Sequence, residues 1–536
     1  MNYYSFDIFD TCLVRLCGEP HNLIDVLSKE LFNTDDELQR QLFVANRIKA
    51  DDGSSDGLEG IYKRVASCCS LPLPIKDMAE REMHLERKML VAVAKTKQLV
   101  DELRTKGRIM FVSDMYLSSD FLREVLREHG FYQAEDLLYV SDEHNALKRD
   151  GSLFRLIHEK EGISYRKWHH YGDNKHSDYH IPSRLGIRAH HLCFPYLRYE
   201  KRWMDHITLQ FQYTSILAGV SRAIRLQTPY TNQNAFVCNI SAPLMTSWVL
   251  KIMNDAVSRN IHRLYFCARD AHAEYIIARQ ISPLFQNLNI HYLFISREAL
   301  NSERSLCMDY FKQIGLASHE PVAIVDTNTT GNTLDRINNI LRSYGYNSAE
   351  GYFWSFVPQR GEYPHPTENN FSSHYYVNCF YLNSTAKRGA GWMTGMSAIY
   401  EMLFSLNYHK KTTSYYHHCG MVRPQLATDA EDKWTLLPDV AKAKRNNDFL
   451  LTQFAQALVD THIDKYCNHI FAHLALPTLI DFIEHPRKEY LLYMNRFIWR
   501  GKPYVNKIWK KHIWKRGSRL YSIPSSLSKI LYGLFF

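Results

Sequence analysis

The sequence predicts an α/β protein in which two parallel sheets follow one another along the chain. Short apolar runs typical of buried strands alternate with stretches of helical periodicity, and this alternation indicates parallel sheets covered by helices. The pattern starts at the N-terminus and starts again near residue 235. Reactive side chains follow several of the apolar runs, at the sheet edge where α/β proteins bind ligands.

Composition is that of a folded protein with several domains. The 536 residues exceed what one core holds, and 45% apolar with 23% charged residues excludes a disordered chain. No uninterrupted apolar run reaches about 18 residues, so we expect no transmembrane helix, and the first residues do not resemble a signal peptide. The 11 cysteines include no C-x-x-C pair, which favours reduced thiols and a cytoplasmic location.

Positive charge is concentrated near the C-terminus. Residues 490–536 hold ten Lys and Arg and no Asp or Glu, so the net charge of +9 leaves about −1 for the rest, and no nucleic-acid partner is expected. Segments 504–515 and 525–536 each place apolar residues on one helical face with lysines around it. A peripheral membrane anchor, a helix docked on the protein itself and a nucleic-acid-binding arm share this pattern. We expect the first, as a basic amphipathic tail.

The first predicted sheet has strands at residues 3–9, 108–113, 136–141 and 168–173. Helical periodicity fills most of the interval between the first and second strands. We therefore expect a first domain at 1–208 that carries a helical insertion at about 16–105.

Reactive side chains follow these strands. The set comprises Asp7, Asp10 and Thr11 after the first strand, Ser113 at the end of the second, Lys148 in the segment NALKRDG, and Asp173 and Asp178 after the fourth. Because the carboxyl ends of parallel strands meet at one edge, these side chains are expected to assemble there. A nucleophile, a hydroxyl donor, a cation and metal ligands are what phosphoryl transfer requires.

In order and spacing, this set resembles the four motifs of the haloacid dehalogenase (HAD) superfamily, over residues 1 to about 205. The resemblance implies a Rossmann-like parallel sheet with a helical cap, and phosphohydrolase activity. It implies that Asp7 is the catalytic nucleophile and that Lys148 balances charge. It also implies that Thr11 and Ser113 bind the phosphoryl oxygens.

The same resemblance implies a Mg²⁺ site. Its ligands would be the carboxylates of Asp7, Asp173 and Asp178 and the backbone carbonyl of Phe9. Arg15 lies just past the first motif, and we expect it to meet an anionic substrate under the cap.

One position departs from the phosphatases of this superfamily. They carry a general-acid Asp two residues after the nucleophile, where this chain has Phe9, with Asp10 one residue later. A general acid contributes about 10²–10⁴-fold to the rate. Either Asp10 acts as the catalytic acid from the shifted position, or the leaving group is assisted in another way, or the domain only binds its ligand.

The second predicted sheet has strands at residues 263–268, 291–296, 322–326 and 351–356. We assign it to an α/β domain at 209–385. Residues 386–489 have a mostly helical pattern without strand alternation, so a helical region is expected there.

The loop after the third of these strands has the composition of a phosphate cradle. Asp326 ends the strand, and small hydroxyl residues with a glycine lead into a helix, whose N–H groups attract anions. The loop resembles the phosphoribosyl-diphosphate motif of type I phosphoribosyltransferases, which implies that Asp326 is a catalytic residue that binds the ribose hydroxyls. The implied 5-phosphate ligands are Thr329, Thr330, Gly331, Asn332 and Thr333. The family's first acidic residue is replaced by Val325, and a Thr-rich helix cap without a ligand is the alternative.

Arginines follow two neighbouring strands of this sheet. Arg269 and Arg297 suit the oxygens of a diphosphate, because a guanidinium offers a planar fork of donors. Ion pairs with Asp270 or Glu298 would explain the same arginines. Asp270 and His272 are candidates for the base that activates an acceptor hydroxyl.

The pairing of the two domains resembles the bifunctional ribofuranosyltransferases of bacterial surface polysaccharides, such as O-antigen and capsule. That resemblance implies transfer of 5-phosphoribose from phosphoribosyl diphosphate to a glycan acceptor, including a lipid-linked one, followed by removal of the 5-phosphate. It also implies a cytoplasmic protein, peripheral on the inner membrane. Two alternatives are a sugar-phosphate phosphatase with a non-catalytic positioning domain, and a scaffold that senses phosphorylated ligands.

Overall fold

The computed structural model divides the chain into two compact units. One comprises Met1–Asn234 with Asp460–Ile463, and the other comprises Ala235–Val459 with Asp464–Phe536. The structure describes residues 1–32, 36–51, 53, 56–205, 211–229, 231–329, 331–356, 370–372, 375–382, 404, 410–428, 438–463, 474, 478, 481, 498–499 and 502–503. The expected boundary at 208 falls outside these ranges, and the first unit extends through α11 (Phe211–Leu226).

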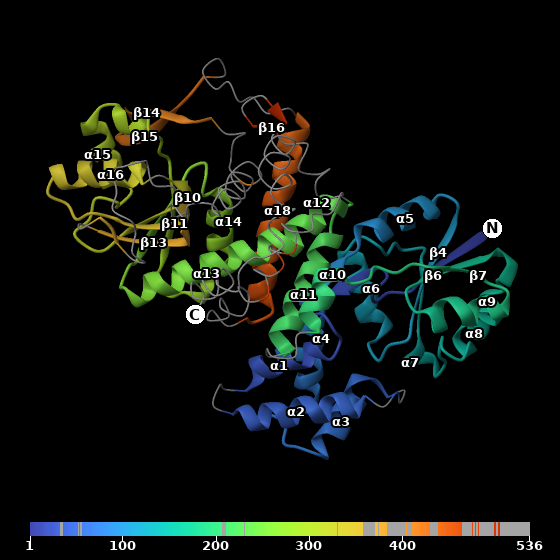
Figure 1. The fold of residues 1–536 in the computed structure, drawn as a ribbon. Helices are drawn as coiled ribbons and strands as arrows, with labels where there is room; N and C mark the ends of the chain where they lie inside the picture. The colour runs from blue at the N-terminus through green and yellow to red at the C-terminus, as the bar shows by residue number, and fades with distance from the viewer. Residues whose placement is uncertain are drawn as a thin grey trace, which may run out of the picture. The chain divides into compact units, whose positions relative to one another are not determined.

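The first unit is built on a five-stranded parallel sheet (Figure 1). Its order is β5 (Leu137–Val140), β4 (Gly107–Ser113), β1 (Asn2–Phe6), β6 (Trp168–Gly172) and β7 (Arg188–His191). The four predicted strands are among these five, and the predicted α/β class is confirmed. β1, β4 and β6 are central, and consecutive buried residues in β1 and β4 show that these two strands are buried on both faces. Strand order reverses at β1, which opens a crevice at its carboxyl end.

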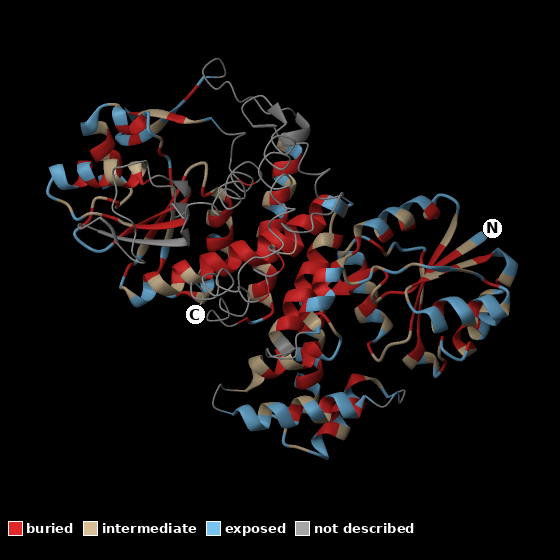
Figure 2. Cartoon of the chain, viewed as in Figure 1, coloured by how far each residue is buried: buried red, intermediate tan, exposed pale blue. Residues whose placement is uncertain are grey.

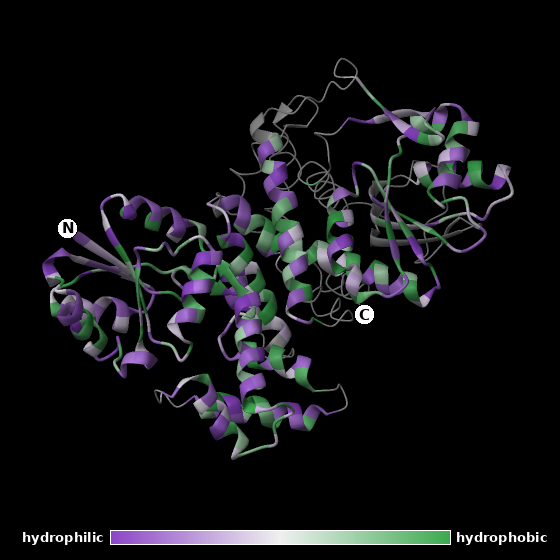
Figure 3. Cartoon of the chain, turned by 180° about the vertical axis from the view of Figure 1, so that it is seen from behind, coloured by the Kyte–Doolittle hydropathy of each residue, from purple (hydrophilic) through white to green (hydrophobic). Residues whose placement is uncertain are grey.

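A helical insertion follows β1, at the place where a cap is expected. It lies between the short strands β2 (Leu13–Arg15) and β3 (Leu90–Ala92), which pair antiparallel. Its helices are α1 (Asn22–Leu31), α2 (Glu37–Ala50), α3 (Gly57–Ala66) and α4 (Ile75–Met89). Hydropathy colouring shows hydrophilic and hydrophobic residues along these helices (Figure 3). The expected bound at about residue 105 takes in one helix too many, because α5 (Ala94–Arg104) packs on β4 of the sheet.

One buried carboxylate joins helix α4 to α2, to α3 and to the loop after β4. Glu82 of α4 accepts a two-pronged ion pair from Arg47 of α2 (2.6 and 2.9 Å) and a hydrogen bond from Tyr62 of α3 (2.6 Å). Tyr116, in the loop after β4, also donates to it (3.2 Å). Both charged side chains are almost fully buried. Their attraction is therefore strong, and removing one partner leaves the other charge in an apolar interior.

Replacing this carboxylate should destabilise the first unit strongly. We expect Glu82→Ala to lower the free energy of unfolding by about 3–5 kcal/mol, because Arg47 is left buried without its partner. Urea denaturation followed by circular dichroism measures the change. The matched control is Glu80→Ala on the same helix, whose carboxylate is 60% exposed and pairs with Lys76 at 3.8 Å. Such a surface pair contributes about 0–1 kcal/mol. Equal losses in the two variants would contradict the prediction.

The second unit contains a mixed sheet of six strands (Figure 1). Its order is β12 (Asn370–Ser372), β13 (Tyr375–Leu382), β11 (Glu350–Phe356), β10 (Ala323–Thr329), β8 (Arg263–Cys267) and β9 (Asn289–Leu293). All pairs are parallel except the edge pair β12–β13. Strand order reverses between β8 and β10, and ligands bind at such a point in open α/β sheets. The four predicted strands correspond to four of these six.

A long apolar helical segment precedes this sheet. Residues Asn232–Ser258 are long and apolar enough to cross a membrane by length and mean hydropathy, although the sequence has no uninterrupted apolar run of about 18 residues. Polar residues such as Asn239, Ser241 and Lys251 interrupt the run. Within the structure, 94% of its most apolar window is buried, and α13 (Ala242–Ser258) is coloured as buried along most of its length (Figure 2). A helix that is apolar on all sides is typical of a protein core as well as of a membrane span.

The region expected to be helical contains a hairpin. Strands β14 (Thr412–His418) and β15 (Met421–Leu426) pair antiparallel across a two-residue turn, in which Cys419 and Gly420 both have positive φ. That turn suits the twist of a hairpin, and Gln313 of α15 (Arg304–Gln313) holds the hairpin through the backbone of Val422 (2.6 and 2.9 Å). The expectation of no strand here is therefore wrong. Helix α18 (Pro438–Asp460) fits the expectation, and segments 504–515 and 525–536 lie outside the described residues.

Candidate active sites

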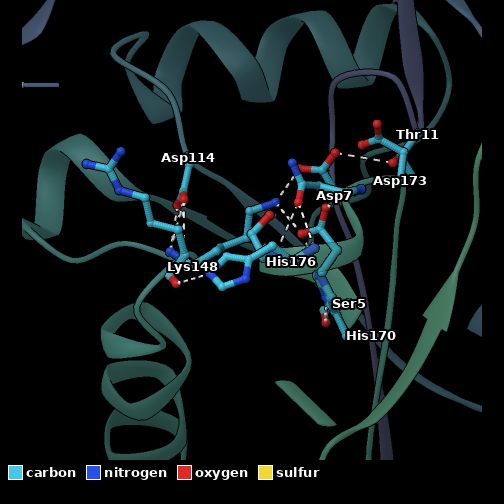
Figure 4. A network of polar contacts seen from close by, with 12 residues as sticks. Ser5, Asp7, Thr11, Asp114, Lys148, His170, Asp173 and His176 are labelled. Carbon is cyan, nitrogen blue, oxygen red and sulfur yellow. Dashed lines mark hydrogen bonds and ion pairs between the residues drawn. The ribbon is translucent and has the colours of Figure 1, made fainter. Parts of the chain in front are cut away.

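The first site forms where β1 ends. Asp7, the residue after β1, lies opposite Lys148, whose Nζ donates to Asp7 Oδ1 at 2.5 Å and to Asp178 Oδ1 at 2.7 Å (Figure 4). Thr11 Oγ1 donates to Asp7 Oδ2 at 3.2 Å. Asp114 accepts the backbone N–H of Lys148 at 2.8 Å and so fixes the loop that carries the lysine. The predicted residues Asp7, Thr11, Lys148 and Asp178 thus meet at the carboxyl end of β1.

Three carboxylates of this site are placed to hold one metal ion. Ligand oxygens of Asp7, Asp173 and Asp178 lie within 4.8 Å of one another. Lys148 pairs with Asp7 and Asp178, so negative charge is in excess when all three carboxylates are ionised. Hard oxygen ligands with excess negative charge suit Mg²⁺. The residues present therefore fit the predicted ion.

The pKa values of these groups follow from burial and from the charge excess. Burial raises the pKa of Asp7 above its ordinary range, with Lys148 acting against it. Burial, together with Asp10 and Asp178, raises the pKa of Asp173 to about 6. Burial alone would lower the pKa of Lys148, but Asp7 and Asp178 raise it well above its ordinary value. A bound divalent cation would reduce the repulsion between the carboxylates, which is one cause of the raised pKa values of Asp7 and Asp173.

Ser113 and Phe9 occupy the expected places along the chain. Ser113 is the last residue of β4 and is buried, and β4 pairs with β1 so that both strands end at the same edge. The backbone of Phe9 forms a bridge with Leu13 in the turn after β1. Their roles toward a phosphate and a metal remain predictions.

Asp10 has a partner that the sequence did not reveal. Its Oδ1 accepts from Arg222 of α11 at 2.5 Å, and Asp10 itself has a φ of 58°. Arg222 also donates to the Phe194 carbonyl at 2.9 Å and lies over the ring of Tyr196. The carboxylate offered as a replacement general acid is thus engaged by a guanidinium.

Arg15 does not reach the place expected for it. Its guanidinium is buried and pairs with Glu86 of α4 at 2.7 Å, 4.3 Å above the centre of the Phe9 ring. Arg15 therefore joins β2 to the insertion, and the expectation that it meets the substrate is wrong. Glu86 could not be predicted as the partner, because Arg15 and Glu86 are 71 positions apart in the sequence.

Ser5, Trp168 and His170 form a second group that sequence reasoning missed. Hydrogen bonds join the three side chains, and His170, which is labelled with Ser5 in Figure 4, contacts Asp178. Trp168 and His170 alternate along β6, so both point to one buried face. That alternation in the segment WHHYG was the available signal.

The second unit has a cavity of about 480 Å³ at the carboxyl edge of its sheet. Its lining residues come from β8, β9, β10 and the loops that follow them, from the start of α16 (Asn332–Ser343), and from the hairpin with the segment before it: Cys267, Ala268, Arg269, Asp270, Tyr292, Phe294, Ile295, Ser296, Arg297, Asp326, Thr333, Lys410, Lys411, Thr412 and Leu426. Four are cationic and two are carboxylic, so the cavity suits a polyanion that also carries hydroxyl groups. It lies at the point where strand order reverses.

The predicted residues of the second site meet in this cavity in part. Arg269, Arg297, Asp326 and Thr333 line it. Gly331, with a φ of 85°, is the residue before α16 (Asn332–Ser343), as expected for a loop that opens a helix. Thr330 lies outside the described residues, as does the side chain of Thr329. Lys410 and Lys411 were missed, because they follow a segment without any strand or phosphate-loop pattern.

The acidic residues around this cavity have distinct environments. Asp326 Oδ1 accepts the backbone N–H of Thr327 at 2.9 Å. Burial raises the pKa of Asp270, against the effect of Arg269. Glu298 pairs with Lys411, and His272 lies 3.4 Å from Asp448 and does not line the cavity. Of the two candidate bases, Asp270 therefore has the better position.

Comparisons with known proteins concern the first unit. No family model matches the chain, and no curated protein matches it. Similar solved structures include a HAD-family enzyme from Bacteroides thetaiotaomicron (14% identity, 36% of this chain, 93% of that chain, TM-score 0.27). A HAD phosphatase from Thermococcus onnurineus is also similar (22% identity, 35% of this chain, 84% of that chain, TM-score 0.26). L-2-haloacid dehalogenase from Xanthobacter autotrophicus is another (13% identity, 40% of this chain, 88% of that chain, TM-score 0.30). A variant of the Bacteroides enzyme was solved with magnesium and inorganic phosphate. Identities this low do not carry an activity across, so the case for the first site depends on its own geometry.

Proposed function

We propose that this chain is a bifunctional enzyme that transfers 5-phosphoribose from phosphoribosyl diphosphate to a glycan acceptor and then removes the 5-phosphate. The first unit would be the phosphohydrolase, and the second unit the transferase. The observation that carries the hydrolase is the contact of Asp7 with Lys148 beside two further carboxylates. The observation that supports the transferase is the cationic cavity at the reversal of strand order.

At the first site, Asp7 would attack the phosphorus atom and break its bond to the 5-oxygen of the ribose, which leaves as a hydroxyl with a proton from solvent. Water would then hydrolyse the resulting aspartyl phosphate to inorganic phosphate and restore Asp7. The ammonium of Lys148 offsets the negative charges of Asp7 and Asp178 and holds the carboxylate of Asp7 in place. Mg²⁺, held by the three carboxylates, would neutralise charge on the phosphoryl oxygens. Thr11 orients Asp7 through its hydroxyl.

The Arg222 contact leads to a prediction about the second step. Asp10 is held by Arg222, and Phe9 has no acid–base group, so water should be activated slowly. With p-nitrophenyl phosphate, whose leaving group needs no protonation, we expect a burst of nitrophenol equal to the enzyme concentration, followed by a slow steady rate. Rapid mixing measures both phases. Asp10→Asn should leave them unchanged. Linear release without a burst, or a loss of the steady rate in Asp10→Asn, would mean that Asp10 is the acid–base group.

The charges and position of the second cavity support a diphosphate ligand. Arg269 and Arg297 offer paired donors suited to its oxygens, and Asp326 is placed to accept hydrogen bonds from ribose hydroxyls. Asp270 is the proposed base for the acceptor hydroxyl, because burial moves its pKa toward the working pH of a general base.

Product analysis tests the whole proposal. The full chain is incubated with Mg²⁺, phosphoribosyl diphosphate and candidate glycan acceptors, and pyrophosphate and phosphate are measured separately. The expected result is acceptor-dependent pyrophosphate release, followed by phosphate release of similar amount. Phosphate release from sugar phosphates without any pyrophosphate would leave only the phosphatase. Binding of both ligands without turnover would indicate a phospho-ligand sensor.

We also propose a peripheral position on the cytoplasmic membrane face, with a lipid-linked acceptor, on the basis of the basic tail. Removal of residues 501–536 should release the protein from anionic vesicles while leaving activity on a short soluble acceptor nearly unchanged. Vesicle flotation and activity are measured together, with neutral vesicles as the control. An insoluble or unfolded truncated protein would indicate that the tail is part of a core.

A further inference from the structure

A continuous line of hydrogen bonds runs through the core of the first unit to the metal site. Trp168 Nε1 donates to Ser5 Oγ at 2.7 Å, and Ser5 Oγ lies 2.7 Å from His170 Nδ1. His170 Nε2 lies 3.1 Å from Asp178 Oδ1, the oxygen that also accepts from Lys148 (Figure 4). Trp168, Ser5 and His170 are fully buried and lie on the paired strands β1 and β6.

The direction of each hydrogen bond follows from its neighbours. An indole N–H only donates, so Ser5 Oγ accepts from Trp168. The carboxylate of Asp178 accepts, so His170 Nε2 carries a proton. A neutral imidazole then has an acceptor at Nδ1, to which the hydroxyl of Ser5 donates.

These bonds fix the carboxylate of Asp178. Its Oδ1 accepts from both His170 and Lys148, while Oδ2 accepts the backbone N–H of Asn174 at 3.1 Å. With both oxygens constrained, the group cannot rotate without breaking hydrogen bonds. Burying three polar side chains between strands costs free energy unless their polar atoms are hydrogen-bonded. Here each of the three side chains is hydrogen-bonded.

We propose that His170, supported by Ser5 and Trp168, is a positioning residue that orients Asp178 for a divalent cation and so sets the metal affinity of the site. Among the described residues, the contacts of His170 are with Ser5, Asp178 and Phe154, and none of these is the nucleophile. Partners behind metal ligands of other proteins change metal affinity about 10–100-fold when they are lost. The inference rests on the metal site that the proposed phosphohydrolase requires.

Direct binding of Mn²⁺, a Mg²⁺ substitute visible by electron paramagnetic resonance, tests the inference without substrate. We expect His170→Leu in the full chain to weaken Mn²⁺ binding about 10–100-fold. His170→Gln places an amide N–H near the position of Nε2 and should restore most of the affinity. Ser5→Ala should lose about two- to tenfold, as expected for one neutral hydrogen bond.

The matched control is His169→Leu, the same change on the neighbouring residue of β6, whose side chain points to the other face and stacks on His190. It should leave Mn²⁺ affinity unchanged, and Asp173→Asn should remove most binding. Equal affinity of His170→Leu and the parent chain would overturn the positioning role alone. A parent that binds no Mn²⁺ would overturn the metal site as well. If His170→Leu does not fold, the Mn²⁺ affinities of Ser5→Ala and His170→Gln test the positioning role instead. A Ser5→Ala protein that binds Mn²⁺ as tightly as the parent chain would then overturn the inference.

Discussion

Asp7→Asn should abolish phosphate release, by a factor on the order of 10⁴ or more, while ribosyl transfer continues. The amide keeps the shape of the side chain but cannot form an acyl phosphate, and loss of a covalent nucleophile has effects of this size. The two candidate sites lie at the ends of separate sheets, in separate units. A phosphoribosylated glycan that still carries its 5-phosphate should therefore accumulate, and mass spectrometry of the product detects it.

Stability measurements distinguish a chemical effect from unfolding. Because burial raises the pKa of Asp7, its ionised form is disfavoured in the folded state without metal. A neutral side chain at this position should therefore not lower the melting temperature of the metal-free protein, and Lys148 keeps Asp178 as a partner. Undiminished phosphate release by a folded Asp7→Asn protein would refute the assignment of the nucleophile. Loss of both activities in a stable protein would refute the independence of the two sites.

The second large effect is expected for Asp326→Ala, which should lose ribosyl transfer and spare hydrolysis of a pre-made 5-phosphoribosyl glycan. Hydrogen bonds from ligand hydroxyls to a buried carboxylate contribute roughly 1.5–3 kcal/mol, a loss of about tenfold to a hundredfold in binding. Positive charge on the ribose in the transition state would interact with the same carboxylate. The kcat for transfer should therefore fall together with affinity. Both half-reactions are measured on one preparation.

A matched variant separates charge from structure at this position. Asp326→Asn keeps an oxygen that can accept the backbone N–H of Thr327 and removes only the negative charge. If Asp326 holds the ribose, both variants should lose transfer at an unchanged melting temperature. If it only caps the loop, Asp326→Asn should behave like the parent, while Asp326→Ala should lose stability and all activities together. Unimpaired transfer in a stable Asp326→Ala protein would remove the basis of the phosphoribosyltransferase assignment.

Residues at strand ends were the part of the sites that the sequence predicted well. Asp7, Ser113 and Asp326 each end or directly follow an apolar run, and such runs identify strands because burial on both faces leaves no polar alternation. Parallel strands end at one edge, so short local patterns were enough to place distant residues in one crevice. Lys148 and Asp178 were placed by their spacing from these runs in the same way.

Residues that reach a site from helices or later segments could not be predicted. Arg222 pairs with Asp10 across 212 positions, and a buried arginine on a helix has no sequence pattern that names its partner. Lys411 contributes to the second cavity because the hairpin packs on α15, which depends on tertiary contacts of Gln313. Arg15 shows the converse case. Its position beside the first motif suggested a substrate contact, but a buried glutamate on α4 satisfies its charge.

The return of residues Asp460–Ile463 to the first unit has a consequence for biosynthesis. Asp460 lies 3.4 Å from Lys88 of α4, and His462 contacts Glu30 of α1 at 2.7 Å, so the insertion is completed by residues that are made long after it. At about 5–20 residues per second, translation of the intervening chain takes on the order of tens of seconds. During that interval the nascent first unit exposes the surface of α1 and α4 that these residues later cover. Fragments that stop at Asn234 lack these residues and leave that surface uncovered.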